Sequence, residues 1–155
     1  KIALGCGMKV IYSDSFVENA AISLAFYDGQ KVNFSFKTQS LESLLKESDF
    51  ISLHVPAQKE YVIGASEISQ MKNGAALINA ARGGVIDEVA LIEALENKKL
   101  SFAALDVFEN EPTPEIKILM NTKISLSPHI GAATLEAQDR IGEELAEQII
   151  SISKA

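Results

Sequence analysis

The feature that most constrains the fold is a series of short, continuous apolar segments that alternate with segments of helical length. The apolar segments span residues 50–55, 75–79, 102–107 and 124–126. A strand buried on both faces reads as a continuous apolar run, whereas a strand with one wet face alternates apolar and polar residues. The pattern therefore predicts an α/β fold with a Rossmann-like, doubly wound parallel sheet, covered by helices on both faces.

Turn and capping residues predict the other elements. Residues 8–12 form an apolar run that predicts a further buried strand. The pair Asp28-Gly29 favours a tight turn and predicts a hairpin within residues 22–37. Helices are predicted after the capping residue Ser40, over residues 66–72 and 87–98, and after Thr134. On the third of these helices Val89 is expected to face the core.

Charge and cysteine content exclude several classes of protein. The chain has 14 basic and 21 acidic residues, a formal charge of −7, so we expect neither a nucleic-acid nor an anionic-membrane partner. No apolar run approaches the roughly 20 residues that span a bilayer. The single cysteine, Cys6, excludes an internal disulfide and a metal site of several thiolates. We expect a cytoplasmic protein without a metal, in which Cys6 is buried.

Asp14 lies two residues after the end of the apolar run at residues 8–12, with Ser13 between them. In dinucleotide-binding folds an acid at this place accepts hydrogen bonds from the ribose hydroxyls of the adenosine. An acid also repels a 2′-phosphate, so the sequence favours NAD over NADP. The alternative is that Asp14 caps the turn that follows it, and Asp14 alone supports both interpretations equally.

The glycine-rich loop that normally lies ~20 residues before such an acid is not found after Lys1. Residues 5–7 offer only Gly-Cys-Gly, which leads into a predicted strand and reads as a helix end. We therefore expect residues 1–155 to be a partial NAD-binding domain that lacks its first strand and glycine-rich loop. We expect these residues alone to be inactive, because unpaired strand edges in a core are costly.

Parallel strands joined by right-handed crossovers all end at one edge of the sheet, where ligands bind in such folds. Unusual polar residues follow the predicted strands at this edge, namely Asp14, His54, Arg82, Asp106 and His129. Their convergence on one edge predicts a site, although each residue also has an ordinary structural explanation.

Three of the residues at this edge suggest chemistry. The planar guanidinium of Arg82 can bind a carboxylate at two points, the alternative being a surface ion pair with Asp87. A histidine beside a carboxylate is a general acid–base pair, and His129 with Glu111 has this composition. Packing at a helix start and a solvated loop are the structural alternatives for His129 and Glu111.

Three segments resemble the signatures of the D-isomer-specific 2-hydroxyacid dehydrogenases. They are residues 79–87 (NAARGGVID), 105–112 (LDVFENEP) and 127–134 (SPHIGAAT). Residues 49–56 (DFISLHVP) and 136–138 (EAQ) look most like the branch of the family that acts on D-3-phosphoglycerate. The resemblance implies an NAD-dependent oxidoreductase that transfers a hydride between the nicotinamide and a D-2-hydroxy acid, and a homodimer. It also implies a substrate-binding domain, which is absent from this chain.

Two other interpretations stay open at this point. One is a sister dehydrogenase that acts on glyoxylate, hydroxypyruvate or D-lactate, because the residues that select the substrate lie mostly in the other domain. The other is an NAD-binding module without catalysis, as in corepressor-like relatives of the family.

The resemblance also implies roles for individual residues. Arg82 would bind the substrate carboxylate, His129 would transfer the proton, and Glu111 would support His129. Asp14 would hold the adenosine ribose, and Asp106 would contact the nicotinamide carboxamide. The other cofactor contacts would come from His54, Val55 and Pro56 on the adenosine side, and from Ala80, Ala81, Arg82, His129 and Gly131 near the nicotinamide.

Overall fold

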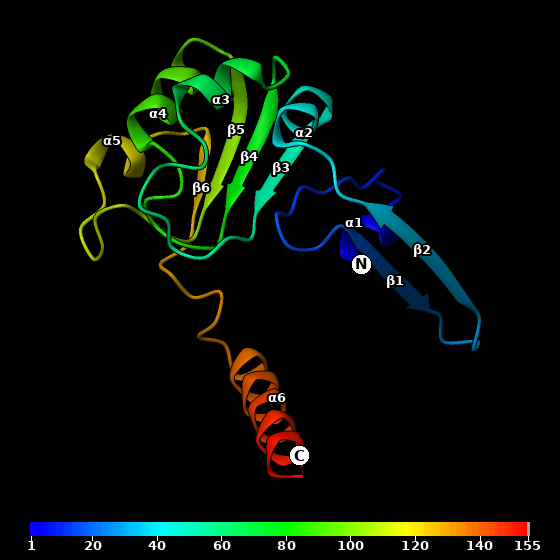
Figure 1. Cartoon of the computed structure of the whole chain (residues 1–155). Coiled ribbons are helices and arrows are strands. Elements are labelled where there is room, and N and C mark those ends of the chain that lie inside the picture. Colours follow the sequence, from blue (N-terminus) through cyan, green and yellow to red (C-terminus); the bar gives the residue numbers. More distant parts are fainter. Residues whose placement is uncertain (155) are drawn as a thin grey trace.

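The computed structural model describes residues 1–154, and its main body is a parallel sheet of four strands (Figure 1). The strands are β3 (Phe50–Leu53), β4 (Ala75–Asn79), β5 (Leu100–Leu105) and β6 (Ile124–Leu126), and they lie side by side in that order. Every neighbouring pair is parallel. The α/β class and the four strands predicted from the apolar runs are thereby confirmed.

Four helices pack against one another along a single face of this sheet. They are α2 (Leu41–Glu47), α3 (Ala65–Gln70), α4 (Glu88–Glu96) and α5 (Ile116–Leu119). Right-handed crossovers between strands that are consecutive in sequence and in space place all connecting helices on one side. On the opposite face Phe50 is 62% exposed and Phe102 is 42% exposed. Within residues 1–154, the expected covering of both faces is therefore wrong, and the sheet corresponds to one half of a doubly wound arrangement.

The core lies between the sheet and these helices. Leu77, Leu91, Leu95 and Leu100 are fully buried there, and burial of each such side chain contributes about 1.5–3 kcal/mol. Val89 is 67% exposed, contrary to expectation. The reason is that Glu88, Leu91, Ile92 and Leu95 form the buried face of α4, and Val89 lies outside it.

The N-terminal part differs from the sequence prediction at one element. The first helix, α1, covers Ile2–Gly5, and Cys6 after it is exposed instead of buried. Residues 8–12 do not form the predicted strand, because no strand among residues 1–154 pairs with them. Within residues 1–154 the backbone of this segment bonds to other segments at its two ends: Met8 N–H donates to the Ala3 carbonyl, and the Tyr12 carbonyl accepts from Gln39 N–H.

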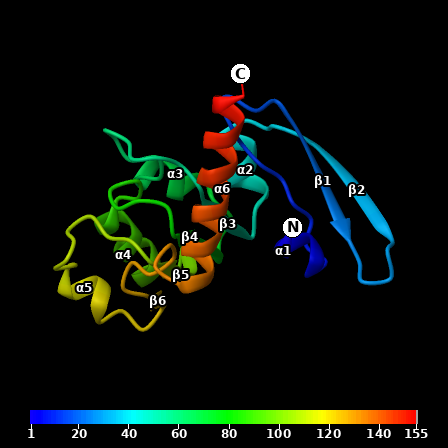
Figure 2. The same ribbon diagram turned by 90° about the horizontal axis from the view of Figure 1, so that it is seen from below.

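The predicted hairpin is confirmed. It consists of the antiparallel strands β1 (Asn19–Ala25) and β2 (Lys31–Lys37), and Gly29 in its turn has the positive φ that the sequence led us to expect. Figures 1 and 2 both show this hairpin standing apart from the four-stranded sheet.

The last helix, α6 (Leu135–Ser153), begins where Thr134 was predicted to cap it, since the Thr134 hydroxyl accepts a hydrogen bond from Ala137 N–H. Figure 1 shows α6 extending away from the sheet, past the edge at which the strands end. Its apolar residues Ile141, Leu145 and Ile149 are exposed. No helix in residues 1–154 is both long and apolar enough to cross a bilayer.

Candidate active site

The turn after β4 carries Arg82 and is organised by Asn79, a buried amide at the end of the strand. The Asn79 side chain accepts a hydrogen bond from Ala81 N–H at 3.0 Å and donates one to the Arg82 carbonyl at 2.9 Å. A side chain that bonds the backbone on both sides of a turn fixes its shape. The small residues of the turn are therefore held in one conformation at the edge where the strands end.

Asp106, directly after β5, plays a similar part for the loop that carries His129. It is 7% exposed, and its two oxygens accept three hydrogen bonds, from Ser127 Oγ (2.6 Å), Ile130 N–H (3.0 Å) and Gly131 N–H (2.9 Å). Burial by itself would raise the pKa of Asp106, but these three donors outweigh it and lower the pKa. Asp106 is thus a carboxylate that anchors the loop on both sides of His129.

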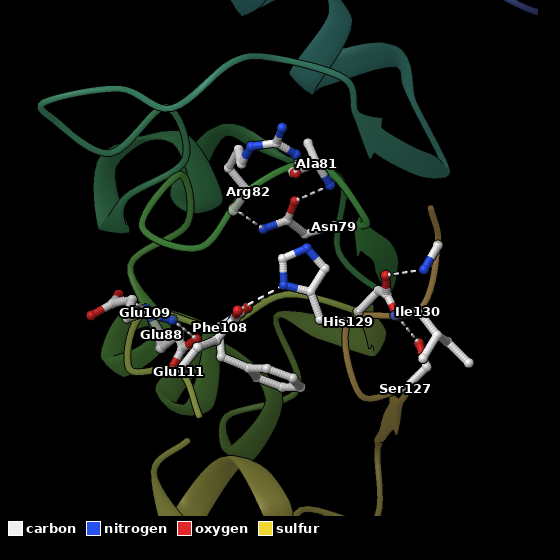
Figure 3. Close-up of polar contacts among 12 residues, drawn as sticks. Asn79, Ala81, Arg82, Glu88, Phe108, Glu109, Glu111, Ser127, His129 and Ile130 are labelled. Carbon is white, nitrogen blue, oxygen red and sulfur yellow. Dashed lines mark hydrogen bonds and ion pairs between the residues drawn. The ribbon is translucent and has the colours of Figure 1, made fainter. Parts of the chain in front are cut away.

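His129 itself has a φ of 55°, which is uncommon for a residue other than glycine. Such a conformation costs of order 1–3 kcal/mol and persists only where surrounding bonds enforce it. The bonds from Asp106 to Ile130 and Gly131 supply that constraint. The strained backbone directs the imidazole of His129 toward Glu111 (Figure 3).

His129 and Glu111 form a close pair. Nδ1 of His129 lies 2.7 Å from Oε2 of Glu111, while Oε1 of Glu111 accepts a hydrogen bond from Phe108 N–H at 3.0 Å. The bond with His129 and then the bond with Phe108 N–H lower the pKa of Glu111, so its side chain is a carboxylate near neutral pH. Because a carboxylate only accepts, Nδ1 must carry the proton, and Nε2 of the neutral ring is then a free base.

A cavity of about 480 Å³ borders this pair, and its walls include Phe108, Leu119, Leu126, Glu111 and His129. Both side chains of the pair remain open to solvent, since that of His129 is 48% exposed and that of Glu111 is 34% exposed. The predicted meeting of His129 and Glu111 is therefore present in the structure. The arrangement can take up or release one proton at Nε2.

Arg82 is placed at the same edge of the sheet but not in this cavity. Its Nη1 donates a hydrogen bond to the Ala81 carbonyl at 2.6 Å, and Figure 3 shows the guanidinium directed away from the His129 ring. No ion pair with Asp87 is formed in the described residues; Asp87 instead caps α4 through Val89 and Ala90 N–H. Arg82 must rotate away from its own turn to reach a ligand beside His129.

The residues predicted to contact the adenosine are spread more widely. His54 follows β3 at the common edge, with Nε2 2.9 Å from Ser52 Oγ. Asp14 is not brought there by a strand; Oδ1 accepts from Phe16 and Val17 N–H, and these two bonds lower the pKa of Asp14. The capping alternative thus describes what Asp14 does in this structure. Binding of the ribose by Asp14 stays a prediction.

Two further residues of the site were not predicted from the sequence. Asn79 bonds to the turn that carries Arg82, and Ser127 donates a hydrogen bond to Asp106. The signal that could have identified Asn79 is an amide closing an otherwise apolar strand, because a buried amide must bond to something. Ser127 gives no such signal, since serines before Pro-His occur in many loops.

Replacing Asp106 by Asn should destabilise the protein by about 2 kcal/mol near neutral pH, because the buried amide would offer one acceptor oxygen to three donors. The folded pKa of Asp106 lies below that of an unfolded Asp, about 3.9. Its contribution is therefore complete above the unfolded pKa and is lost as the pH falls through the folded pKa. Urea unfolding at pH 7 and at pH 3 measures both effects.

The matched control is Asp139→Asn, at an exposed position on α6. It should leave the free energy of unfolding within about 0.5 kcal/mol of the wild-type value at either pH. If Asp106→Asn behaved like this control, Asp106 would not anchor the loop.

Taken together, the parallel sheet, the small-residue turn after β4 and the acid–base pair at the end of the strands define a Rossmann-like nucleotide-binding domain. The family model described as "D-isomer specific 2-hydroxyacid dehydrogenase, NAD binding domain" matches residues 1–131. The chain belongs to this family, and NAD is the cofactor of the domain.

Individual relatives agree with the family match. A hydroxypyruvate reductase of Thermotoga maritima is 44% identical over 154 residues, which are 96% of this chain and 46% of the relative. A D-3-phosphoglycerate dehydrogenase of Archaeoglobus fulgidus is 43% identical over 121 residues, or 76% of this chain and 23% of the relative. The crystal structure of a glyoxylate reductase from Paecilomyes thermophila covers 69% of this chain and 33% of its own, at 41% identity and a TM-score of 0.65. The chain thus spans less than half the length of these relatives.

The edge of the sheet fits the reactive end of this cofactor. The turn after β4 presents only the methyl groups of Ala80 and Ala81 before Arg82, so a flat ring can approach its backbone closely. The free nitrogen of His129 can accept one proton, as a general base does. No cluster of three or more potential ligands for a metal ion occurs in residues 1–154.

Proposed function

We propose that this chain, as part of its complete protein, supports the NAD-dependent interconversion of a D-2-hydroxy acid and the corresponding 2-oxo acid, with D-3-phosphoglycerate as the substrate. The observation that carries the proposal is the His129–Glu111 pair, held by Asp106 and bordering a cavity. We further propose that the complete protein is a cytoplasmic homodimer.

In the direction of oxidation, Nε2 of His129 accepts the proton of the substrate hydroxyl. NAD, when bound, supplies the acceptor for the hydride that leaves C2. The Glu111 carboxylate, 2.7 Å from Nδ1, stabilises the imidazolium that forms. In reduction the same nitrogen returns its proton to the carbonyl oxygen, so one pair serves both directions.

The Arg82 guanidinium supplies the remaining function, which is to orient the substrate. After rotating from the Ala81 carbonyl, it binds the carboxylate of the 2-hydroxy acid at two points, so that C2 faces the nicotinamide. In our proposal Asp14 and the segment 54–56 bind the adenosine half, whereas Asp106 and Gly131 border the nicotinamide.

Arg82→Lys in the complete protein should lower kcat/KM by about 10- to 100-fold, chiefly through a higher KM. A lysine keeps the charge but loses the two-point geometry, and a hydrogen bond to a charged group contributes about 1.5–3 kcal/mol. Initial rates over a range of substrate concentrations measure the change. An unaltered kcat/KM would remove Arg82 from the carboxylate site.

A second candidate substrate is hydroxypyruvate or glyoxylate, in a reductase. It is favoured by the higher identity of the hydroxypyruvate reductase of T. maritima, which is 44% over 96% of this chain, whereas a D-3-phosphoglycerate dehydrogenase of Synechocystis that also covers 96% of this chain is 37% identical. The residues at the sheet edge serve either substrate, because both present a carboxylate next to the reacting carbon.

The deciding experiment assays the complete protein with NAD and D-3-phosphoglycerate, D-glycerate, glycolate or D-lactate, and with the corresponding 2-oxo acids and NADH. We expect the highest kcat/KM for D-3-phosphoglycerate. Preference for glyoxylate or hydroxypyruvate would support the second candidate. NADH binding without turnover of any of these acids would contradict catalysis and support a non-catalytic NAD-binding module.

A further inference from the structure

Glu88 is the first residue of α4, yet it is only 6% exposed. Its Oε2 is buried without a hydrogen-bond partner in residues 1–154. Burial raises the pKa of Glu88, and the nearby charges of Glu109 and Glu115 act in the same direction against the bond from Glu109 N–H. A buried acid with an unpaired oxygen is costly, and the proposed reaction makes no direct use of it.

Glu88 and Glu109 are joined by two reciprocal bonds. Oε1 of Glu88 accepts a hydrogen bond from Glu109 N–H at 2.9 Å, and Oε1 of Glu109 accepts one from Glu88 N–H at 3.0 Å (Figure 3). These two hydrogen bonds, which we call the Glu88–Glu109 clasp, connect the start of α4 to the loop after β5. Because Leu91 and Leu95 of α4 are fully buried, the clasp attaches the loop to a rigid part of the core.

The loop held by the clasp is the one that carries Glu111. Glu109 N–H, which Glu88 binds, is next in the chain to Phe108, whose N–H donates to Oε1 of Glu111 at 3.0 Å. The other oxygen of Glu111 binds His129. Three hydrogen bonds, with the Phe108 backbone between the first and the second, thus lead from α4 to the imidazole.

We propose that Glu88 is a positioning residue for the Glu111–His129 pair: by holding Glu109 N–H it fixes the backbone that presents Phe108 N–H to Glu111. The catalytic meaning of this coupling rests on the proposed function, but the coupling itself does not. A residue that merely stabilised the start of α4 would change the free energy of unfolding and leave the state of Glu111 and His129 as it was.

The test compares Glu88→Ala, which removes the acceptor, with Glu88→Gln, which keeps an acceptor oxygen without the charge. Carbon-13 NMR of the side-chain carboxyl follows the titration of Glu111. Nitrogen-15 NMR of the imidazoles reports the tautomer of His129, whose signal is assigned as the one that is lost in His129→Asn. Both measurements are made on the folded protein and require no turnover.

Glu88→Ala is expected to raise the pKa of Glu111 toward its ordinary value, because Phe108 N–H, one of the donors that lower it, is released. The share of the tautomer protonated at Nδ1 of His129 should fall. Glu88→Gln should retain the wild-type behaviour of both groups. In the complete protein kcat should drop by up to about 100-fold for Glu88→Ala at unchanged Kd for NADH, since small displacements of reacting groups have effects of this size.

Two controls isolate the effect. Glu93→Ala, at an exposed position of the same helix, should change neither signal. In a Glu111→Gln background, Glu88→Ala should cause no further change at His129. If Glu88→Ala does not fold, Glu88→Met keeps the volume without the acceptor and is measured in the same way.

The proposal is overturned if removal of the acceptor leaves Glu111 and His129 as in the wild type, or if Glu88→Gln disturbs them as much as Glu88→Ala. Expected NMR shifts in a protein that turns over none of the 2-hydroxy acids would leave the coupling in place and reject the proposed function alone.

Discussion

Replacing His129 by Asn is expected to lower kcat of the complete protein by about 10²- to 10⁴-fold, the usual contribution of a general acid–base group. Asn is the better replacement because it tolerates the φ of 55° at this position, which would strain Ala. Since His129 acts on the proton of the substrate, the Kd for NADH should be unchanged. Initial rates and a fluorescence titration with NADH measure the two quantities.

Asp139→Asn makes the same small chemical change at an exposed position of α6 and should retain wild-type kcat. Unchanged turnover in His129→Asn would reject His129 as the proton-transfer group. A loss of NADH binding together with turnover would instead place His129 in the cofactor site alone.

Gly83→Ala should be among the most destabilising single-methyl changes in this chain. A Cβ at Gly83 would lie 1.8 Å from the carbonyl oxygen of Phe108 and 2.6 Å from its carbonyl carbon. Both are backbone atoms, so either the Arg82 turn or the loop after β5 must move, and overpacking of this kind costs about 3 kcal/mol. Because Phe108 N–H holds Glu111, the displacement should also reduce kcat.

Gly142→Ala is a matched control, for which the expected change in the free energy of unfolding has the opposite sign. Gly142 lies within α6 and has open space around the position of a Cβ, so alanine should stabilise the helix by about 1 kcal/mol. Urea unfolding of both variants, with kcat measured in parallel, tests the pair. Equal stabilities of Gly83→Ala and the wild type would mean that the two loops do not approach as closely as described.

The sheet could be predicted because its signal is local. Each run of apolar residues at 50–55, 75–79, 102–107 and 124–126 became a strand, and Thr134 and Ser40 cap helices as expected. The strand predicted at 8–12 did not form, since pairing depends on a neighbour that a local pattern cannot specify. Whether helices cover one face of the sheet or both depends likewise on the order of the strands in the sheet, and apolar runs in the sequence do not specify that order.

The candidate site was predictable in part. Glu111 follows β5 and His129 follows β6, and these neighbouring parallel strands end at the same edge of the sheet. A histidine and a carboxylate brought together there can form the hydrogen bond that is observed. The orientation of Arg82 was not predictable, because a long side chain has many rotamers and its own turn offers an acceptor. Glu88 was missed for a different reason: an acid in the first turn of a helix normally faces water, and nothing in the sequence marks this one as buried.

The most direct test of the account follows the hydrogen that the reaction transfers. The complete protein is incubated with NAD and D-3-phosphoglycerate, D-glycerate, glycolate and D-lactate, each deuterated at C2, and the NADH formed is analysed by mass spectrometry and proton NMR. If the hydride leaves C2 and His129 takes the proton, deuterium appears at C4 of the nicotinamide with at least one of these acids, and His129→Asn does not form this product. NADH without deuterium, or bound NAD that is never reduced by any of them, would contradict this mechanism.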